Sequence, residues 1–217
     1  MQKKEKTYKI GLYILTLLCS MTAFGQGQII TNNLDTTKLP IGIKLTGNVK
    51  SAVRWTDKLG DNIVITTETG ETINKTAPSD DYRDAALYAY HYIEIKDSII
   101  LTWKVYDFIK ECPLDIEANF VKNTFQVTDL NNDGVAEVWL MYKTVCHGDI
   151  SPSNMKIIMY QGQQKYAMRG RNKVQISDKE SVGGDYKFDK AFNDGPTIFK
   201  DFAIKLWDRN CLQTWGE

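Results

Sequence analysis

The chain has 217 residues, of which 27 are basic and 27 are acidic, so its formal net charge is zero. Setting aside residues 1–25 as a leader leaves 23 basic and 26 acidic residues, a net charge of −3. This mildly acidic composition excludes the clustered basic face that nucleic-acid binding requires, and the remaining chain of about 190 residues fits one domain.

The N-terminus has the composition of a signal peptide. A basic stretch with four lysines precedes an apolar stretch, Ile10–Phe24, which is shorter than the ~20 apolar residues of a membrane span. Ala23 and Gly25 occupy the small-residue positions of a cleavage site, so we expect cleavage before Gln26. The sequence therefore predicts a signal peptide over residues 1–25 and an exported protein, periplasmic, secreted or at the cell surface, with no membrane span after cleavage.

Residues 26–39 are rich in Thr, Asn and Gln and are expected to form a flexible lead-in to a single β-rich domain over residues 40–217. From Pro40 onward, short runs alternate apolar and polar residues and are separated by turn residues, which is the pattern of half-buried strands. The expected strands are Ile41–Leu45, Val49–Trp55, Ile63–Thr67, Tyr88–Ile95, Ile99–Phe108, Phe120–Val127, Val135–Thr144, Asn154–Tyr160 and Gln164–Arg169.

The end of the chain has a different period. Its apolar residues recur at helical spacing, which predicts a helix over Thr197–Asn210 that covers one face of the sheet. Either Thr197 or Asp194 is expected to cap its N-terminus. The fold class predicted for the whole domain is mainly β, with α+β as the alternative. We expect an antiparallel sheet or sandwich of short strands and hairpins with the C-terminal helix packed on it.

The segment from Asp129 to Glu137 carries the clearest pattern of site chemistry. Oxygen-bearing side chains stand at its first, third, fifth and ninth positions, and a glycine stands at the sixth. Alternate side chains of a tight loop point inward, and Ca²⁺ takes about six to eight oxygen ligands. The sequence therefore predicts a calcium site whose ligands are Asp129, Asn131, Asp133, Glu137 and the backbone carbonyl of Val135.

The residues around this loop decide which kind of calcium loop it resembles. A helix–loop–helix hand needs a bidentate Glu at position twelve, where this chain has Leu140, and the flanking segments Phe125–Val127 and Val138–Tyr142 alternate like strands. The segment instead resembles the short calcium loops of integrin-type FG-GAP repeats, although only one good copy occurs. A metal-free β-turn is the alternative, because Asn-Asp-Gly forms tight turns without an ion.

Three cysteines follow the expected cleavage site, namely Cys112, Cys146 and Cys211. Export permits disulfides, and we expect the pair Cys112–Cys146, because both residues lie at ends of expected strands that flank the acidic loop. Such a bond would tether the base of that loop. A Cys146–Cys211 bond and three free thiols stay open as alternatives, since sequence alone does not fix connectivity.

Three further patterns are weaker as sites. Cys146 and His147 could form a nucleophile–base pair, but neighbours on a strand point to opposite faces, so a disulfide at a strand end is the better interpretation. His91 is expected to be a packed histidine, because two histidines in the chain give little support to a zinc site. The Tyr and Trp stripes are typical of sheet core, with a sugar-stacking platform as the alternative.

Several stretches together resemble a family of exported bacterial proteins labelled surface polysaccharide biosynthesis proteins. They are residues 55–62, 128–138 and 146–156, together with Trp103, Asp107–Phe108 and Arg169–Gly170. The resemblance spans nearly the whole mature chain. It implies a role in envelope glycan assembly and supplies no catalytic residues.

We therefore expect a non-enzymatic exported protein that supports surface polysaccharide biosynthesis or display, stabilised by calcium and contacting an envelope glycan or an envelope protein. Two alternatives stay open. A periplasmic glycan-acting enzyme would use a pair of Asp or Glu residues as acid and base, although nothing in the sequence marks two of them as partners. A glycan-binding module would hold a polysaccharide without cleaving it.

Overall fold

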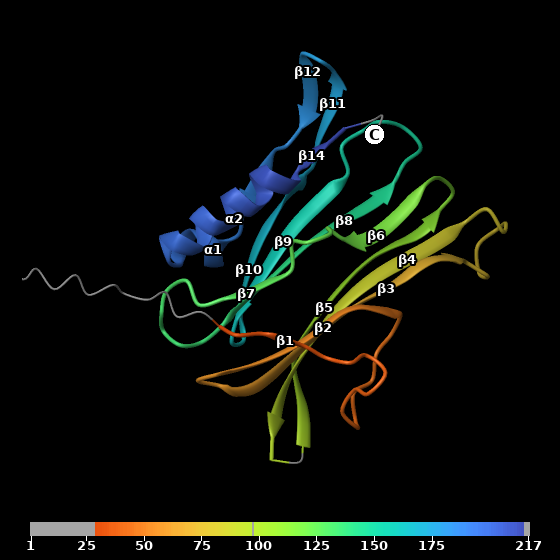
Figure 1. Cartoon of the computed structure of the whole chain (residues 1–217). Coiled ribbons are helices and arrows are strands. Elements are labelled where there is room, and N and C mark those ends of the chain that lie inside the picture. Colours follow the sequence, from red (N-terminus) through yellow and green to blue (C-terminus); the bar gives the residue numbers. More distant parts are fainter. Residues whose placement is uncertain (1–28, 97, 215–217) are drawn as a thin grey trace, which may run out of the picture.

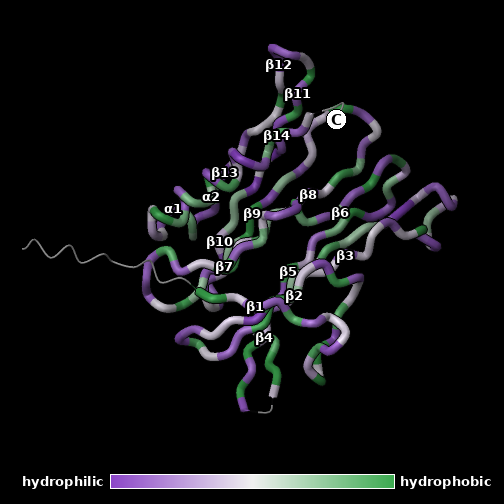
Figure 2. The backbone as a smooth tube through the Cα atoms, viewed as in Figure 1, coloured by the Kyte–Doolittle hydropathy of each residue, from purple (hydrophilic) through white to green (hydrophobic). Residues whose placement is uncertain are grey.

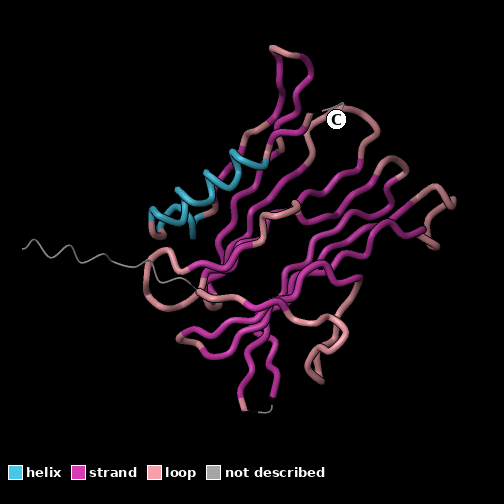
Figure 3. Tube along the Cα trace, in the orientation of Figure 1, coloured by secondary structure: helices cyan, strands magenta, loops and turns pink. Residues whose placement is uncertain are grey.

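The structure is a computed structural model, and it describes residues 29–96 and 98–214. The expected signal peptide, residues 1–25, lies outside these residues. Antiparallel sheets make up most of the described chain, and a C-terminal helix lies on one of them (Figure 1, Figure 3), so the predicted mainly β architecture is confirmed. Within the described residues, no helix is long and apolar enough to cross a bilayer.

The first sheet contains five strands in chain order, each antiparallel to the next. They are β1 (Asn32–Asn33), β2 (Asn48–Asp57), β3 (Gly60–Ile73), β4 (Arg83–Ile95) and β5 (Ser98–Cys112). Alternating residues of β3 and β4 are buried on both faces of this sheet. Val64 and Leu87 face the second sheet, whereas Ile63 and Tyr90 face the opposite way, where Leu39 and Leu45 cover them.

The second sheet has the strand order β13-β10-β9-β8-β6, and β7 also pairs with β8. These strands are β6 (Ile116–Phe120), β7 (Gln126–Thr128), β8 (Glu137–Cys146), β9 (Asn154–Gln161), β10 (Gln164–Arg171) and β13 (Tyr186–Phe188). A smaller sheet joins β11 (Lys173–Ser177), β12 (Glu180–Gly183) and β14 (Leu212–Gln213). The helices are α1 (Lys190–Asp194) and α2 (Thr197–Asn210).

The core has two main layers because the second sheet is apolar on both faces. One layer lies between the two sheets and includes Trp55, Trp103 and Leu140. The other lies between the second sheet and the helices and includes Trp139 and Trp207. Figure 2 shows apolar residues recurring along the strands of both sheets, while the connecting turns are largely hydrophilic. Helix α2 therefore covers the sheet as its spacing predicted.

Two segments that were expected as strands are not continuous strands in the structure. The segment expected as a strand over Ile41–Leu45 is irregular, and Ile41 is 100% exposed beside Gly42, whose φ is +100°. The run expected over Phe120–Val127 is interrupted between β6 and β7, where Asn123 has a φ of +59° and the Thr124 hydroxyl donates to the Val121 carbonyl. A turn thus replaces the middle of the expected strand.

The expected N-cap of the second helix is also wrong. Thr197 is the first residue of α2, and Pro196 precedes it with no side-chain cap among the described residues. Asp194 ends α1, and it is Asp189 that caps α1 by accepting a hydrogen bond from the Phe192 N–H at 3.0 Å. Sequence analysis did not predict the short helix α1, and the side-chain cap belongs to α1 and not to α2.

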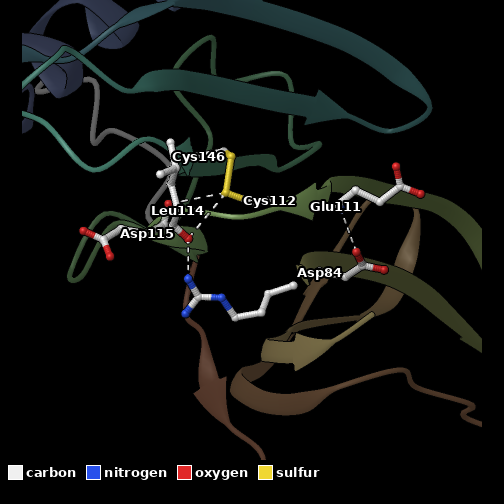
Figure 4. Close-up of a disulfide and its surroundings, with 7 residues drawn as sticks. Asp84, Glu111, Cys112, Leu114, Asp115 and Cys146 are labelled. Atoms are coloured by element: carbon white, nitrogen blue, oxygen red, sulfur yellow. Dashed lines mark hydrogen bonds between the residues drawn. A yellow bond between two sulfur atoms is a disulfide. The ribbon is translucent and has the colours of Figure 1, made fainter. Parts of the chain in front are cut away.

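The disulfide Cys112–Cys146 is present, as predicted, with its Cα atoms 5.8 Å apart. It joins the end of β5 to the end of β8, so it connects the two sheets (Figure 4). Cys146 lies nine residues beyond Glu137 along β8, which is roughly 30 Å at ~3.3 Å per residue. The disulfide therefore links the two sheets at the end of the sandwich that is remote from the acidic loop. The expectation that it tethers the base of that loop is wrong.

Candidate calcium loop

The acidic loop connects β7 to β8 and is shaped by its own side chains. Asp129 Oδ2 accepts a hydrogen bond from the Gly134 N–H at 3.1 Å, and Asp133 Oδ1 accepts one from the Val135 N–H at 2.8 Å. Gly134 has a φ of +81°, a backbone conformation that favours glycine, and the Lys58 side chain lies over it. The turn chemistry of Asn-Asp-Gly therefore folds the loop.

Each of the three carboxylates holds the loop with one oxygen, and the second oxygen of Asp133, Oδ2, also accepts a hydrogen bond within the loop, from Asn131 Nδ2 at 2.8 Å. The second oxygen of Asp129, Oδ1, is buried and has no hydrogen-bond partner among the described residues, in a side chain that is 8% exposed. Glu137 Oε2 accepts hydrogen bonds from the Leu130 N–H at 2.8 Å and the Thr128 hydroxyl at 2.7 Å, which leaves its Oε1. Leaving a buried carboxylate oxygen unpaired is costly. Asp129 Oδ1 is therefore available to bind a cation.

The side-chain nitrogen of Gln161 lies among the remaining oxygens. Its Nε2 is 2.9 Å from Asp133 Oδ2, 3.4 Å from Asn131 Oδ1, and 3.5 Å from both the Val135 carbonyl oxygen and Glu137 Oε1. Gln161 ends β9, which pairs with β8 so that Gln161 stands opposite Glu137. Four of the five predicted ligand residues therefore surround one point.

Two of the three loop carboxylates, Asp129 and Glu137, are buried, whereas Asp133 is exposed. Glu137 is 0% exposed, and burial raises its pKa to about 7. The carboxylates of Asp129 and Asp133 raise the same pKa further, while hydrogen bonds from Leu130 and Thr128 lower it. A bound divalent cation would offset this repulsion and favour the ionised form of Glu137.

The donor set fits a hard cation, because every candidate ligand atom is an oxygen. Calcium–oxygen distances are about 2.3–2.6 Å, so around an ion that took the place of the Gln161 nitrogen these oxygens would move inward by at most about 1.2 Å. In the described part of the chain, no group of three or more His, Cys, Asp or Glu side chains is gathered closely enough to hold a metal. The three carboxylates of the loop, Asp129, Asp133 and Glu137, are therefore not gathered around one point in this structure. The loop thus has calcium-type ligands in a slightly open arrangement.

Asp57, at the end of β2, fixes this loop from the first sheet. Its Oδ2 accepts hydrogen bonds from the Ala136 N–H and from Trp55 Nε1, both at 3.0 Å. Its Oδ1 accepts from the Leu59 N–H at 2.8 Å and from Asn62 Nδ2 at 3.0 Å. One carboxylate therefore orders the β2–β3 turn and also holds the residue next to Glu137.

Lys58, the next residue, adds two contacts to the loop. Its N–H donates to the Gly134 carbonyl at 2.9 Å, and its ammonium donates to the Asp133 carbonyl. This positive charge therefore binds the loop backbone and not a carboxylate. The β2–β3 turn and the acidic loop consequently form one contact between the two sheets.

A column of aromatic rings lies beneath that contact. His91 stacks on Trp55 with ring centroids 5.7 Å apart and on Trp103 at 5.0 Å, and Trp103 stacks on Tyr160 of the second sheet at 4.2 Å. His91 is buried, and its Nε2 lies 3.0 Å from Asn62 Oδ1. The interpretation of His91 as a packed histidine is confirmed.

The Cys146–His147 pair is not a nucleophile–base pair in the structure. Cys146 is bonded to Cys112. His147 Nδ1 lies 3.0 Å from the Asp149 carbonyl oxygen, and its Nε2 lies 3.3 Å from the Ser153 hydroxyl. The interpretation as a disulfide at a strand end therefore holds.

Gln161 and Asp57 were missed by sequence reasoning. Gln161 reaches the loop because β8 and β9 pair in one particular register, and an expected hairpin without a register does not place it there. Asp57 is 79 residues from Ala136. A signal for it did exist, since residues 55–62 belong to the stretches that carry the family resemblance.

Comparisons with family models, with curated proteins and with solved structures find no match for this chain. The expected membership of a surface polysaccharide family therefore stays a prediction. The arrangement of the loop oxygens is therefore the basis for the calcium proposal below.

Proposed function

We propose that this chain is an exported, non-enzymatic protein that supports surface polysaccharide biosynthesis or display, and that its acidic loop binds calcium. The observation that carries the calcium proposal is the convergence of four loop oxygens on the side-chain nitrogen of Gln161. The buried Oδ1 of Asp129, which has no partner among the described residues, supports it because a cation would satisfy this oxygen. The polysaccharide proposal rests on the resemblance of residues 55–62, 128–138 and 146–156 to that family.

Each ligand residue has a defined part when calcium is bound. Asp129 and Glu137 bind through Oδ1 and Oε1, the oxygens that do not hold the loop, and Asp133 binds through Oδ2, which exchanges its hydrogen bond from Asn131 for the ion. Asn131 and Val135 bind through amide and backbone oxygens. The amide of Gln161 withdraws from the point that its Nε2 occupies, and its Oε1 turns towards the ion that takes this place. Calcium then links the β7–β8 loop to the end of β9 and stiffens this end of the sandwich.

An acid–base enzyme is the alternative function, and Glu137 provides the observation that favours it. A carboxyl whose pKa is about 7 suits proton transfer at neutral pH. Glu137 is fully buried, however, and Thr128 and Leu130 occupy one of its oxygens. A substrate does not reach this carboxyl in the present conformation, so we favour a binding role over catalysis.

Thermal unfolding with calcium and with a chelator tests the calcium proposal. At a roughly hundredfold excess over the Kd, bound calcium stabilises the fold by about 2.7 kcal/mol, which raises the Tm of a domain of this size by roughly 5–10 °C. The increase should vanish in Asp133→Asn, which keeps the turn-forming Oδ1, and persist in Asp178→Asn, at an exposed residue of the β11–β12 turn. A Tm that responds to neither calcium nor chelator would remove the calcium proposal.

The cellular part of the proposal has a separate test. Deletion of the gene should reduce surface polysaccharide, and the wild-type chain should restore it. Cell fractionation should find the protein outside the cytosol with residues 1–25 removed. A cytosolic protein that retains these residues would contradict the export proposal.

A further inference from the structure

A groove runs along one edge of the sandwich, between β2 and residues 119–130. Two cavities form it, with volumes of about 760 Å³ and 490 Å³. Both are lined by Ser51 and Phe125, so they are contiguous, and each volume lies in the range of small-ligand sites, about 300–1,000 Å³. Strands β1, β2 and β7 meet along this edge (Figure 1).

Uncharged polar side chains line the groove and are not used by the fold. Six of them make no side-chain hydrogen bond with any described residue: Thr31, Asn33, Ser51, Asn119, Asn123 and Gln126. Each amide offers both donors and an acceptor, and each hydroxyl can donate and accept. The groove therefore suits a ligand whose own groups both donate and accept, such as the hydroxyl groups of a sugar.

Four charged residues line the groove, Lys50, Glu68, Lys122 and Asp129, and their formal charges sum to zero. Lys50 and Glu68 form an ion pair at 3.0 Å, and the other oxygen of Glu68 accepts a hydrogen bond from the Phe120 N–H at 2.7 Å. Lys122 is exposed and forms no ion pair with a described residue. The lining thus favours an uncharged ligand over a strongly anionic or cationic one. Phe125, shared by both cavities, offers an apolar ring on which a sugar can stack.

We infer that this groove binds a neutral linear glycan, a segment of the surface polysaccharide. The identity of the ligand class rests on the proposed function, whereas the groove itself rests on its lining residues. Unused amides and hydroxyls bind the sugar hydroxyls, and Phe125 packs against a sugar face.

The groove and the calcium loop share residues. Thr128, Asp129 and Leu130 line the larger cavity and also belong to the loop or its entry. Calcium that binds Asp129 fixes this wall of the groove, so glycan and calcium bind cooperatively. Such coupling is reciprocal, and we expect calcium to raise glycan affinity about tenfold, within the usual range for coupled sites.

Binding of the mature protein to a printed array of neutral linear oligosaccharides, with saturating calcium, tests this inference. The double variant Asn119→Ala/Gln126→Ala removes two unused amides and should weaken binding about tenfold, through the loss of one or two hydrogen bonds. The matched control Gln163→Ala/Gln164→Ala changes two exposed glutamines at the β9–β10 turn and should leave binding unchanged. Equal Tm values for both variants would confirm that neither disturbs the fold.

The outcomes separate this inference from the proposed function. Glycan binding that is weakened by the groove variant and not by the control supports the groove. If calcium binds the loop while no neutral glycan is retained, the groove inference is overturned and the calcium proposal stands. Retention of extended peptides in place of glycans also overturns it, as does glycan binding that the groove variant leaves unchanged. If glycan binds without any calcium binding, the groove is supported and the calcium proposal fails.

Discussion

The side-chain nitrogen of Gln161 lies 2.9 Å from Asp133 Oδ2, although 28 residues separate them. The same nitrogen lies within 3.5 Å of three other loop oxygens, so a neutral amide occupies the place where the loop concentrates negative charge. Rotation about its side-chain bonds can draw this amide back from the loop and present its oxygen in place of its nitrogen. Gln161 can therefore complete the loop as a donor without calcium and as a ligand with it.

Replacing Gln161 by Glu should have opposite effects on the two forms. With calcium, an added carboxylate increases the ligand charge, and we expect about tenfold tighter calcium binding by titration calorimetry. In chelator, a further carboxylate among Asp133 and Glu137 repels them, and the free energy of unfolding should fall by about 1–2 kcal/mol. The control Gln163→Glu, at an exposed turn residue, should change neither. Equal calcium affinity in wild type and Gln161→Glu would show that Gln161 is not a ligand.

Asp57→Ala should destabilise the contact between the β2–β3 turn and the loop. The carboxylate accepts four hydrogen bonds, including those from Ala136 and Trp55. Because bonds to a charged acceptor are worth more than neutral ones, we expect a loss of about 3 kcal/mol by urea unfolding. Asp61→Ala is the matched control, since Asp61 is exposed and accepts only from the Thr56 hydroxyl among the described residues. A cost no larger than that of the control would refute the role given to Asp57.

His91 should make the fold sensitive to mild acid. Burial lowers its pKa from 6.5 to about 4, against a smaller opposite effect of Asp57. The unfolded chain therefore takes up a proton at higher pH than the folded chain. The stabilisation is complete above pH 6.5, is lost as the pH falls towards 4, and amounts to about 3 kcal/mol over that interval.

The His91→Gln variant isolates this effect from other titrating groups. Urea unfolding at several pH values should show that wild type loses stability relative to His91→Gln on acidification, by about 3 kcal/mol. If the stability difference between the two proteins is independent of pH, His91 is not held neutral by the fold.

Removing the disulfide should weaken the sandwich as a whole. The bond closes a loop of 34 residues, for which the chain-entropy estimate is about 3–4 kcal/mol. We expect a loss of this size in the double variant Cys112→Ser/Cys146→Ser, measured by urea unfolding. A reductant should lower the stability of Cys211→Ala but not that of the double variant. Insensitivity of Cys211→Ala to complete reduction would contradict this role.

The sequence predicted those parts of the fold that depend on local pattern. The apolar spacing over Thr197–Asn210 matched α2, because one helix face must be buried wherever the helix docks. The strand alternation from Tyr88 to Ile95 matched most of β4. Short strands such as β11 and β12 were missed, since a few residues paired at the edge of the molecule leave little periodic signal.

Only the part of the candidate site that lies within one turn, Asp129 to Glu137, could be predicted from the sequence. Asp129 to Glu137 showed the ligand spacing, because all these oxygens come from one turn. Gln161 depends on strand register, and Asp57 depends on how the two sheets are stacked. Neither relation is encoded within a short window of sequence. The disulfide pair was found because only three cysteines had to be paired, but its position far from the loop required the direction of β8.

The most direct test is a high-resolution crystal structure of the protein grown with calcium. The account predicts an ion bounded by oxygens of Asp129, Asn131, Asp133, Val135 and Glu137 at about 2.3–2.6 Å, with Gln161 turned so that Oε1 faces it. Crystals at saturating calcium that show no ion, with the Gln161 nitrogen still hydrogen-bonded to Asp133, would contradict it.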